Sequence, residues 1–309
     1  MVRAATAAQL RVVRCRTGGG TFALDLAAVR GVERADRMTP GAGEWPHVGE
    51  LHARGGGVPV LSLAGLLRLP ETVPTPADQL VLTDAAGSPL ALLVEAVSPV
   101  ADVPAGAVHP LPRHAAAPGY RAVIRSGDEL VPWLCPTALL GGGPAAGVPF
   151  AAPPFRRTPA APRADRLLLL PLTDDADGPP WLAAVPAALV EETLGAGRTV
   201  AVPGAAGFVR GLRAWQDGVI AVLDLAAWAG LPGVGDDPTA RVVVVRLPGT
   251  AEPVGLLVRR GVRMVKLPLP HLESTRPFPG GAAGLAGAVE TDAGPVALLN
   301  FGGLVGDCG

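Results

Sequence analysis

The sequence predicts an all-β protein that consists of two tandem domains. Three observations predict it: turn-forming residues are abundant, apolar runs are short and strand-like, and the second half of the chain repeats the first. The 309 residues include 41 Gly and 34 Pro, too many helix-breaking residues for a helical bundle. Hydrophobic residues make up 49% of the chain, which favours packed cores over low-complexity disorder.

A stretch rich in Pro and Gly divides the chain nearly in half. Residues 141–164 have almost no hydrophobic periodicity, which is typical of a semi-extended linker. We therefore predict a first domain over residues 1–143, a linker over 144–164 and a second domain over 165–309.

The two halves match at a separation that only increases along the chain. Small insertions between duplicated segments produce such a drift, whereas chance matches would scatter in both directions. The sequence therefore predicts an internal duplication. The matches, at separations of 160, 162 and 164 residues, are Phe22-Ala23 with Leu182-Ala183, Val60-Leu61 with Val222-Leu223, and Leu92-Leu93-Val94 with Leu256-Leu257-Val258.

Short alternating or continuous apolar runs predict strands. The alternation is clear at residues 22–26 and 58–63, and residues 79–83 and 90–94 flank a predicted hairpin turn over 84–88. The second half repeats this hairpin at 241–247 and 254–258, and its VVVV run suits a strand covered on both faces. Single helical turns are predicted at 63–69, 136–140, 225–230 and 301–305. Many short strands favour small closed barrels.

Charge and cysteine content exclude several classes of function. The net charge is -1 and Lys266 is the only lysine, so no basic stripe is expected for nucleic acid. Cys15, Cys135 and Cys308 are odd in number and far apart, which fits a reducing cytoplasm. Residues 1–10 lack the apolar core of a signal peptide, and no apolar stretch reaches the ~20 residues of a membrane span. We expect a soluble, cytoplasmic protein without membrane insertion.

Enzymatic motifs are missing from the sequence. It contains no GxSxG, HExxH, P-loop or EF-hand pattern, so we expect no catalytic residue, no metal and no cofactor. His47 and His52 are expected in a loop entering a strand, with little chance of a metal site. Asp174, Asp175 and Asp177 are expected in an exposed acidic turn. Solvated loop positions are expected for the other three histidines, namely His109, His114 and His271.

One candidate site for a partner stands in the first half. Arg54 lies on a glycine-flanked turn, and the turn leads through Gly55 into an apolar strand with Val58 and Val60. Arginine is a frequent interface anchor, because its planar fork pairs with carboxylates or carbonyls. The alternative is an ordinary exposed arginine that keeps a hairpin soluble.

These residues belong to an ordered series that resembles the CheW-like domain, a coupling domain of bacterial chemotaxis. The resemblance covers about 120 residues of the first half. The second half is similar but degenerate: Gln216 stands in place of Arg54, and Arg259 stands where an acidic residue is typical. The stretches that carry the resemblance are residues 21–32, 39–40, 48–70, 90–97 and 127–140, and in the second half 207–212, 222–225 and 255–258.

The resemblance implies a fold, partners and site residues. Each CheW-like domain comprises two small SH3-like, five-stranded barrels around a shared apolar core, and acts as a scaffold without catalysis. The implied partners are the regulatory domain of a CheA-type histidine kinase, the cytoplasmic tip of a chemoreceptor and other CheW-like proteins. Gly49 and Arg54 match the family's contact positions. Together with Gly55, Val58 and Val60 they form the predicted partner-binding set.

Three functions remain open at this point. The leading one is a cytoplasmic adaptor that links a histidine kinase to methyl-accepting chemoreceptors or a related array. The second is a divergent protein of the same fold in a non-chemotaxis assembly, in which the second half only supports the folding of the first. The third is a small-ligand or metal-binding protein.

Overall fold

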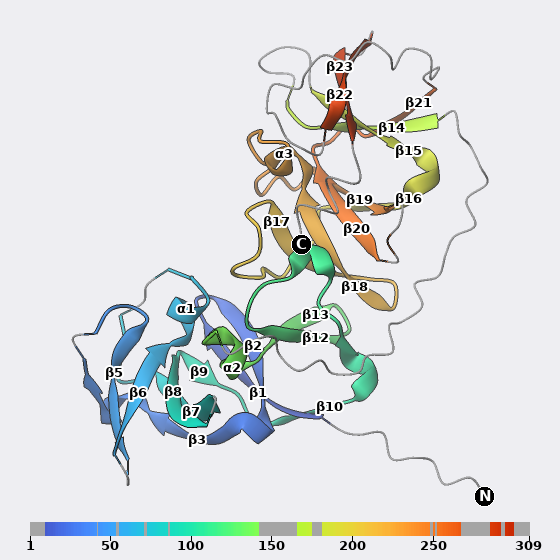
Figure 1. Cartoon of the computed structure of the whole chain (residues 1–309). Helices are drawn as coiled ribbons and strands as arrows, with labels where there is room; N and C mark the ends of the chain where they lie inside the picture. The colour runs from blue at the N-terminus through green and yellow to red at the C-terminus, as the bar shows by residue number, and fades with distance from the viewer. Residues whose placement is uncertain are drawn as a thin grey trace, which may run out of the picture. The chain divides into compact units, whose positions relative to one another are not determined.

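A computed structural model describes residues 10–41, 43–53, 56–70, 73–85, 87–141, 166–174, 181–247, 250, 252–266, 285–291 and 294–299. These residues form mostly β-strands, with a few single-turn helices (Figure 1). They gather into two compact units, the first holding strands β1 to β13 and the second strands β14 to β23. The predicted all-β fold class is confirmed.

In the first domain, one sheet is built from both ends of the domain sequence, and we call it the terminal sheet. Its order is β10-β1-β2-β13-β12-β11, with β9 also paired to β1. The pair β2–β13 is parallel, and the other pairs are antiparallel. Its strands are β1 (Leu10–Thr17), β2 (Gly20–Asp25), β9 (Ala96–Val97), β10 (Ala101–Val103), β11 (Val108–His109), β12 (Tyr120–Ser126) and β13 (Glu129–Leu134).

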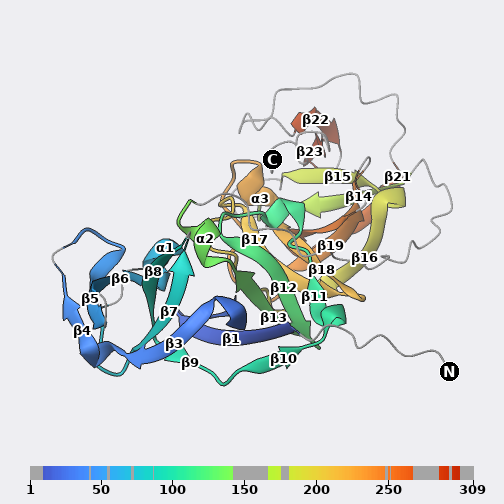
Figure 2. The ribbon, with the colours of Figure 1, turned by 60° about the horizontal axis from the view of Figure 1, so that its bottom comes forward.

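The intervening residues form a second sheet, which we call the middle sheet. Its order is β3-β7-β8-β6-β5-β4, and β6 and β8 are parallel. Figure 2 shows the β5–β6 hairpin at the opposite end of the domain from β10. The strands are β3 (Val29–Arg34), β4 (Met38–Pro40), β5 (His47–Ala53), β6 (Gly56–Ser62), β7 (Gln79–Ala85) and β8 (Ser88–Val94).

The second domain repeats this arrangement. Its terminal sheet has the order β21-β14-β15-β23-β22 and its middle sheet the order β16-β19-β20-β18-β17. As in the first domain, each sheet contains one parallel pair, here β15–β23 and β18–β20. The strands are β14 (Arg166–Pro171), β15 (Leu182–Pro186), β16 (Val190–Gly195), β17 (Val209–Trp215), β18 (Gly218–Asp224), β19 (Arg241–Arg246), β20 (Pro253–Val258), β21 (Arg263–Lys266), β22 (Leu285–Thr291) and β23 (Gly294–Leu299).

Register shifts occur at matching positions of the two domains, which confirms the duplication beyond strand order. In β5 the shift lies between His47 and Gly49, and in β17 it lies between Val209 and Gly211, 162 positions later. β3 and β16 share a second shift, and β12 and β22 share a third. A bulge adds one residue and bends the strand, so shared bulges mean shared curvature.

The predicted helical turns are confirmed wherever they can be compared. α1 (Leu63–Leu66), α2 (Pro136–Leu139) and α3 (Leu225–Trp228) each form a single turn, and the turn predicted at 301–305 lies outside the described residues. The Ser62 hydroxyl accepts from the Gly65 N–H at 3.2 Å, which caps α1. The 3-10 turns are η1 (Leu26–Ala28), η2 (Ala35–Arg37), η3 (Ala105–Ala107), η4 (Arg113–Ala115) and η6 (Ala187–Leu189).

Both faces of the central strands are buried, as the continuous apolar runs predict. In the first domain, Val60, Leu80 and Ala91 fill the interior of the middle sheet, while Val81 and Leu92 on the opposite faces of their strands are equally inaccessible. α2 lies against β7 and β1 against β8, so the two sheets of this domain pack on each other. All residues of β18 and β20 are buried in the second domain.

Two details differ from the expectations. The sheets of the second domain have five strands each, but short additional strands raise the counts in the first domain to seven and six. The predicted turn over 84–88 is shorter, because the pairs Asp84–Pro89 and Ala85–Ser88 extend the hairpin. The predicted linker over 144–164 lies outside the described residues, so its boundaries stay predictions. Among the placed residues, no helix is long and apolar enough to traverse a bilayer.

Candidate functional site

The predicted partner site belongs to the β5–β6 hairpin of the first domain. Arg54 and Gly55 lie between these strands in the sequence and are outside the described residues. Gly49 lies in β5 and pairs with Val60 of β6 on one side and with Pro40 of β4 on the other. Of the predicted residues, Gly49, Val58 and Val60 therefore lie in one hairpin, next to the short edge strand β4.

Gly49 permits a close approach between neighbouring strands. A Cβ atom at this position would overlap the carbonyl oxygen of Thr39 and would lie 2.9 Å from Cγ of Met38. Any larger residue must displace β4, because real Cβ atoms do not come this close to backbone. Gly49 thus acts on the surface of the hairpin through the placement of β4.

Val58 and Val60 have a different role from the one predicted. Val58 is 7% exposed and Val60 is inaccessible, and both belong to the core of the middle sheet. Their side chains face the hydrophobic core, because successive residues of β6 alternate between the core side and the solvent side of the sheet. These valines hold the strand in place and do not offer side chains to a partner in this structure.

The matching hairpin of the second domain, β17–β18, has a fully described turn. Gln216 occupies the position that corresponds to Arg54 and has a positive φ of 48°. The two-residue turn connects Trp215 to Gly218, which face each other across the hairpin. The second domain therefore keeps the geometry of the hairpin and lacks its arginine.

The other departure from the family pattern, Arg259, forms a contact between the two sheets of the second domain. Its guanidinium donates to the carbonyls of Leu172 at 3.1 Å and Gly233 at 3.3 Å, and to the carboxylate of Asp174 at 2.8 Å. Leu172 follows β14 of the terminal sheet, whereas Gly233 follows α3 of the middle sheet. The Arg259 guanidinium therefore forms hydrogen bonds with segments that follow strands or helices of both sheets.

The first domain makes the same connection with the opposite charge. Glu95, which corresponds to Arg259, accepts from the Gly18 N–H at 2.7 Å and pairs with Arg16 at 3.5 Å. Gly18 follows β1 and Asp174 follows β14, the matching first strands of the two terminal sheets. The change from Glu95 to Arg259 thus preserves a hydrogen bond between the sheets, but Glu95 accepts this bond and Arg259 donates it.

Two expectations about the histidines are wrong. His47 and His52 lie within β5, not in a loop before it. His109 and His114 are each 6% exposed, not solvated, and burial lowers the pKa of both below the ordinary value. His109 lies in β11 and His114 in η4, and their burial depends on tertiary packing that the local sequence does not reveal. His271 lies outside the described residues.

The other residues considered as ligands are not assembled into a metal site. Asp174 pairs with Arg259, and Asp175 and Asp177 lie outside the described residues. Within the described part of the chain, no three His, Cys, Asp or Glu side chains come together in a way that could hold a metal ion.

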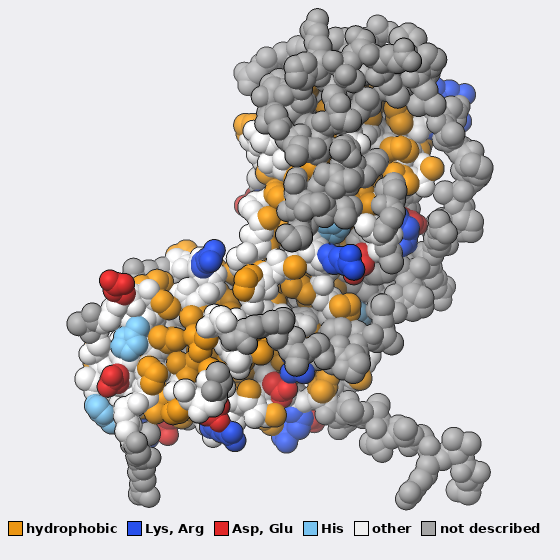
Figure 3. All heavy atoms as spheres, in the orientation of Figure 1, with side chains coloured by type: hydrophobic (Ala, Val, Ile, Leu, Met, Phe, Trp, Pro, Cys, Tyr) orange, Lys and Arg blue, Asp and Glu red, His pale blue; other side chains and the backbone are white. Residues whose placement is uncertain are grey.

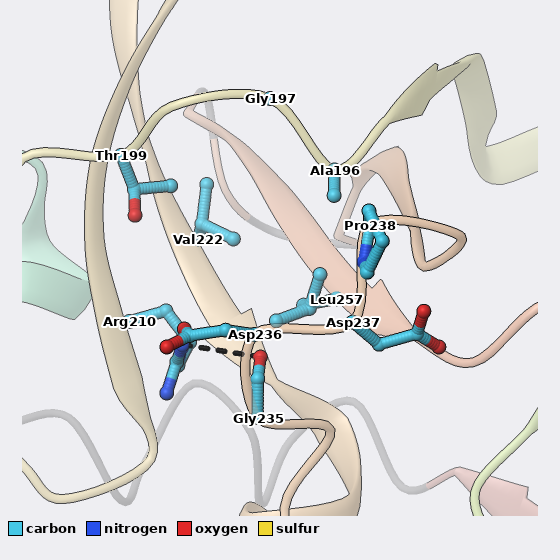
Figure 4. A pocket seen from close by; sticks show the side chains of 10 residues that line it. All are labelled: Ala196, Gly197, Thr199, Arg210, Val222, Gly235, Asp236, Asp237, Pro238 and Leu257. Atoms are coloured by element: carbon cyan, nitrogen blue, oxygen red, sulfur yellow. Dashed lines mark hydrogen bonds and ion pairs between the residues drawn. The ribbon is translucent and has the colours of Figure 1, made fainter.

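A pocket of about 320 Å³ opens at the middle sheet of the second domain, a feature that sequence reasoning missed (Figure 4). Val222 of β18 and Leu257 of β20 form its floor, and the segments 196–199 and 235–238 form two facing walls. Arg210 of β17 lies at one end and donates to the carbonyl of Gly235 at 3.1 Å and to Asp236 at 2.8 Å.

On the face of the first domain shown in Figure 3, hydrophobic side chains are widespread, and acidic and basic side chains lie near one another along the lower edge. Such a surface suits association through burial of apolar area. The duplicated topology defines a class of protein with two tandem domains, each of which is a pair of curled β-sheets.

Comparison with protein families names this class. A family model described as CheW-like domain matches residues 11–142 and 178–308. The chain therefore belongs to the CheW-like domain family and carries two tandem copies of the domain. In general terms it is a chemotaxis-type scaffold, from a family of non-catalytic proteins.

Among solved structures, the chain is similar to the scaffolding protein TtCheW from Thermoanaerobacter tengcongensis. The sequences are 15% identical, the match covers 44% of this chain and 97% of that protein, and the TM-score is 0.40. Among curated proteins, no match to the chain was found.

Proposed function

We propose that the chain is an adaptor that couples a CheA-type histidine kinase to methyl-accepting chemoreceptors or a related signalling array. The observation that carries the proposal is the pair of CheW-like domains, the first of which keeps Gly49 and Arg54 on the β5–β6 hairpin. Coupling requires only protein–protein contacts, and a cytoplasmic location follows from those partners.

The two domains divide this task unequally in the proposal. The first domain supplies the hairpin contact, with Arg54 and Gly55 at its turn and Gly49 holding β4 in place. The second domain has Gln216 at the matching turn, so it contributes a different surface. A linker over residues 144–164 would raise the local concentration of one contact once the other has formed.

The test compares two variants of the full chain at matching turns. Arg54→Ala removes the proposed anchor, and Gln216→Gly removes the corresponding side chain while tolerating the positive φ. We expect Arg54→Ala to weaken binding of the purified kinase regulatory domain or of a receptor-tip fragment about tenfold or more, as for an interface anchor. Gln216→Gly is expected to bind as the parent protein does.

Absence of binding to both the kinase domain and the receptor tip would contradict the proposal. The alternative function, a divergent scaffold in a non-chemotaxis assembly, predicts that Arg54→Ala behaves as the parent protein. Surface plasmon resonance with the purified kinase domain and then with the receptor tip shows whether Arg54→Ala binds more weakly than the parent protein or equally well.

A further inference from the structure

The two domains begin with matching segments of chain. The first, residues 10–34, forms β1 to β3, and the second, residues 166–195, includes β14 to β16; we call them the N-terminal segments. Each contributes two strands to its terminal sheet and an edge strand to its middle sheet. β3 pairs with β7 and β16 with β19 in the same direction, with a register shift at the start of each pairing. Strand geometry alone would therefore allow the two segments to be exchanged between the domains.

Apolar packing also distinguishes little between the N-terminal segments. β3 and β16 both begin with a valine, Val29 and Val190. The strands that they meet, β7 and β19, both bury consecutive aliphatic side chains. Burial of apolar surface is non-directional, so it stabilises exchanged pairs nearly as well as native ones.

In the first domain, the N-terminal segment is basic and the rest of the domain is acidic. Residues 10–34 contain five arginines and two acidic residues, whereas residues 35–140 contain six arginines and ten acidic residues. One ion pair has its acid on the segment, Asp25 with Arg121 at 3.4 Å. Four ion pairs have their base on the segment, with distances between 2.7 and 3.5 Å: Arg11–Asp102, Arg14–Glu129, Arg16–Glu95 and Arg30–Asp84.

In the second domain the charges are reversed. The segment 166–195 contains one arginine and five acidic residues, whereas residues 196–266 contain nine basic and five acidic residues. Arg213 donates to the carbonyl of Gly195 at 2.6 Å, so this contact too has its acceptor on the segment. Two ion pairs have their acid on the segment, each at 2.8 Å: Glu191–Arg246 and Asp174–Arg259.

One of these ion pairs occupies the same place in both domains. Arg30 lies within the register shift of β3, and Glu191 lies within the register shift of β16. Their partners, Asp84 and Arg246, directly follow the residues that face the first valine of each edge strand. The ion pair is thus retained in position, with its two charges exchanged.

Glu95 and Arg259 form a second equivalent position with reversed charge. Their backbone N–H groups donate to the carbonyls of Arg16 at 2.9 Å and Pro171 at 3.2 Å, so both residues meet the first strand of their terminal sheet. Their side chains bond to the same segment with opposite polarity, Glu95 as an acceptor and Arg259 as a donor.

Exchange of the N-terminal segments would bring like charges together at both positions. Between the sheets, Glu95 would meet the oxygen acceptors of residues 172–174, with no proton to share between them. At the edge strands, the facing residues would be Arg30 with Arg246 and Glu191 with Asp84. Like charges that face each other across strands are destabilising, and the native ion pairs would be lost as well.

From this geometry we propose that the reversed charges direct each N-terminal segment to its own domain as the duplicated chain folds. Duplicated domains are prone to mispairing, because they share a topology and the linker keeps them at high local concentration. The native combinations of segment and remainder have net charges of +3 with -4 and of -4 with +4. The exchanged combinations would have +3 with +4 and -4 with -4, so charge opposes exchange where apolar packing does not.

The test detects exchange through a disulfide between strands that are not partners in the native fold. Arg34 faces Gln79 across β3–β7, and Arg241 faces Gly195 across β16–β19. Pairing of β3 with β19 would set Arg34 opposite Arg241, so the full chain with Arg34→Cys/Arg241→Cys links these positions in the exchanged product. The reduced chain is unfolded in urea, refolded by dilution and oxidised. Mass spectrometry measures the linked fraction, and protein that was never unfolded gives the baseline.

Three charge versions of this reporter chain are compared. Arg30→Glu/Asp84→Arg gives the edge strand of the first domain the polarity of the second. We expect the linked fraction to rise about fivefold over the parent, because the exchanged pairs become attractive. Addition of Glu191→Arg/Arg246→Glu makes the polarities opposite again and should return the linked fraction to the parent value. Each version keeps its native ion pairs, so we expect all three to retain the thermal transition.

A matched control and a salt series complete the design. Arg198→Glu/Asp217→Arg changes the same number of charges at exposed positions of the second domain and should leave the linked fraction unchanged. Salt requires no charge substitution: the Debye length falls from about 10 Å at 0.1 M to about 3 Å at 1 M. Refolding of the parent reporter in 1 M NaCl should therefore raise the linked fraction about twofold or more.

An equal linked fraction in the three charge versions would overturn the proposal, as would a rise that the double exchange does not reverse. Absence of linked product in every version, or no response of the parent to salt, would also overturn it. The measurement involves neither kinase nor receptor. A failed kinase-binding experiment therefore counts against the adaptor function alone, and a failed refolding experiment counts against the role of the reversed charges alone.

Discussion

At the scale of single residues, His109 shows how far burial can change a side chain's chemistry. It lies in the two-residue strand β11, is 6% exposed, and has a buried Nδ1 without a hydrogen-bond partner among the described residues. Burial, and secondarily the charge of Arg125, lowers its pKa below the ordinary value of 6.5. The folded protein therefore holds this imidazole neutral.

Burial of His109 predicts a loss of stability on acidification. The unfolded chain takes up a proton as the pH falls below about 6.5, whereas the folded chain does so only at lower pH. The contribution is complete above pH 6.5 and is lost as the pH falls toward the lower, folded-state pKa. We expect His109→Leu to reduce the fall in melting temperature between pH 7.5 and 5.5, measured by circular dichroism.

The control for this experiment is His52→Leu, which replaces an exposed histidine of β5. If both variants show the parent dependence on pH, titration of His109 does not contribute to stability in this range.

At the scale of elements, the contact between the two sheets of each domain persists while its charge reverses. Glu95 serves the first domain and Arg259 the second, each at the end of the strand that pairs in parallel within the middle sheet. Arg259 satisfies several carbonyls at once, and its side chain is 15% exposed, whereas Asp174 is 64% exposed. The hydrogen bonds from Arg259 to backbone carbonyls should therefore contribute more to the free energy of unfolding than its ion pair with Asp174.

Arg259→Met tests this order of importance. It leaves the carbonyls of Leu172, Pro232 and Gly233 without this donor, and we expect the free energy of unfolding to fall by about 1–3 kcal/mol. Asp174→Asn removes only the exposed ion pair and should cost less than about 1 kcal/mol. Urea unfolding followed by tryptophan fluorescence measures both values, and equal losses would contradict the interpretation.

At the scale of the whole molecule, the chain is a duplication whose copies differ at individual side chains and agree in topology. Strand order, parallel pairs and bulges agree between the domains. The side chains differ at the matched positions Arg54 and Gln216, Val48 and Arg210, and Leu51 and Arg213. The two domains thus differ at side chains of the matching hairpins, where a substitution leaves strand pairing intact.

The predicted domain boundaries can be checked by limited proteolysis. Arg156, Arg157 and Arg163 offer trypsin sites within the predicted linker over 144–164. We expect the first cuts of the full chain to fall there and to release two stable fragments, because each domain has its own packed cores. Mass spectrometry identifies the fragments. Early cuts within β1–β13 or β14–β23 would contradict these boundaries, and digestion in urea shows that all arginines are cleavable.

Much of the fold could be predicted from the sequence because it depends on local pattern. The alternation at residues 58–63 predicts β6, the residues before Gly and Pro predict α1, α2 and α3, and the drifting matches predict the duplication. Near the candidate site, the strand with Val58 and Val60 was predicted, but the segment with Gly49 was expected to be a loop and lies within β5. The inward direction of Val58 and Val60 was missed, because a turn and a strand do not reveal which face meets the core.

The sequence by itself determined the strands, their turns and the family of this protein, because strand period, turn residues and repeats are properties of neighbouring positions. Only the tertiary structure decided that His109 is buried, that Arg259 joins two sheets, and that Arg210 and Arg213 donate to backbone carbonyls where Val48 and Leu51 pack on an apolar core. Each of these depends on contacts between residues far apart in the chain, and the register of strand pairing brings them together.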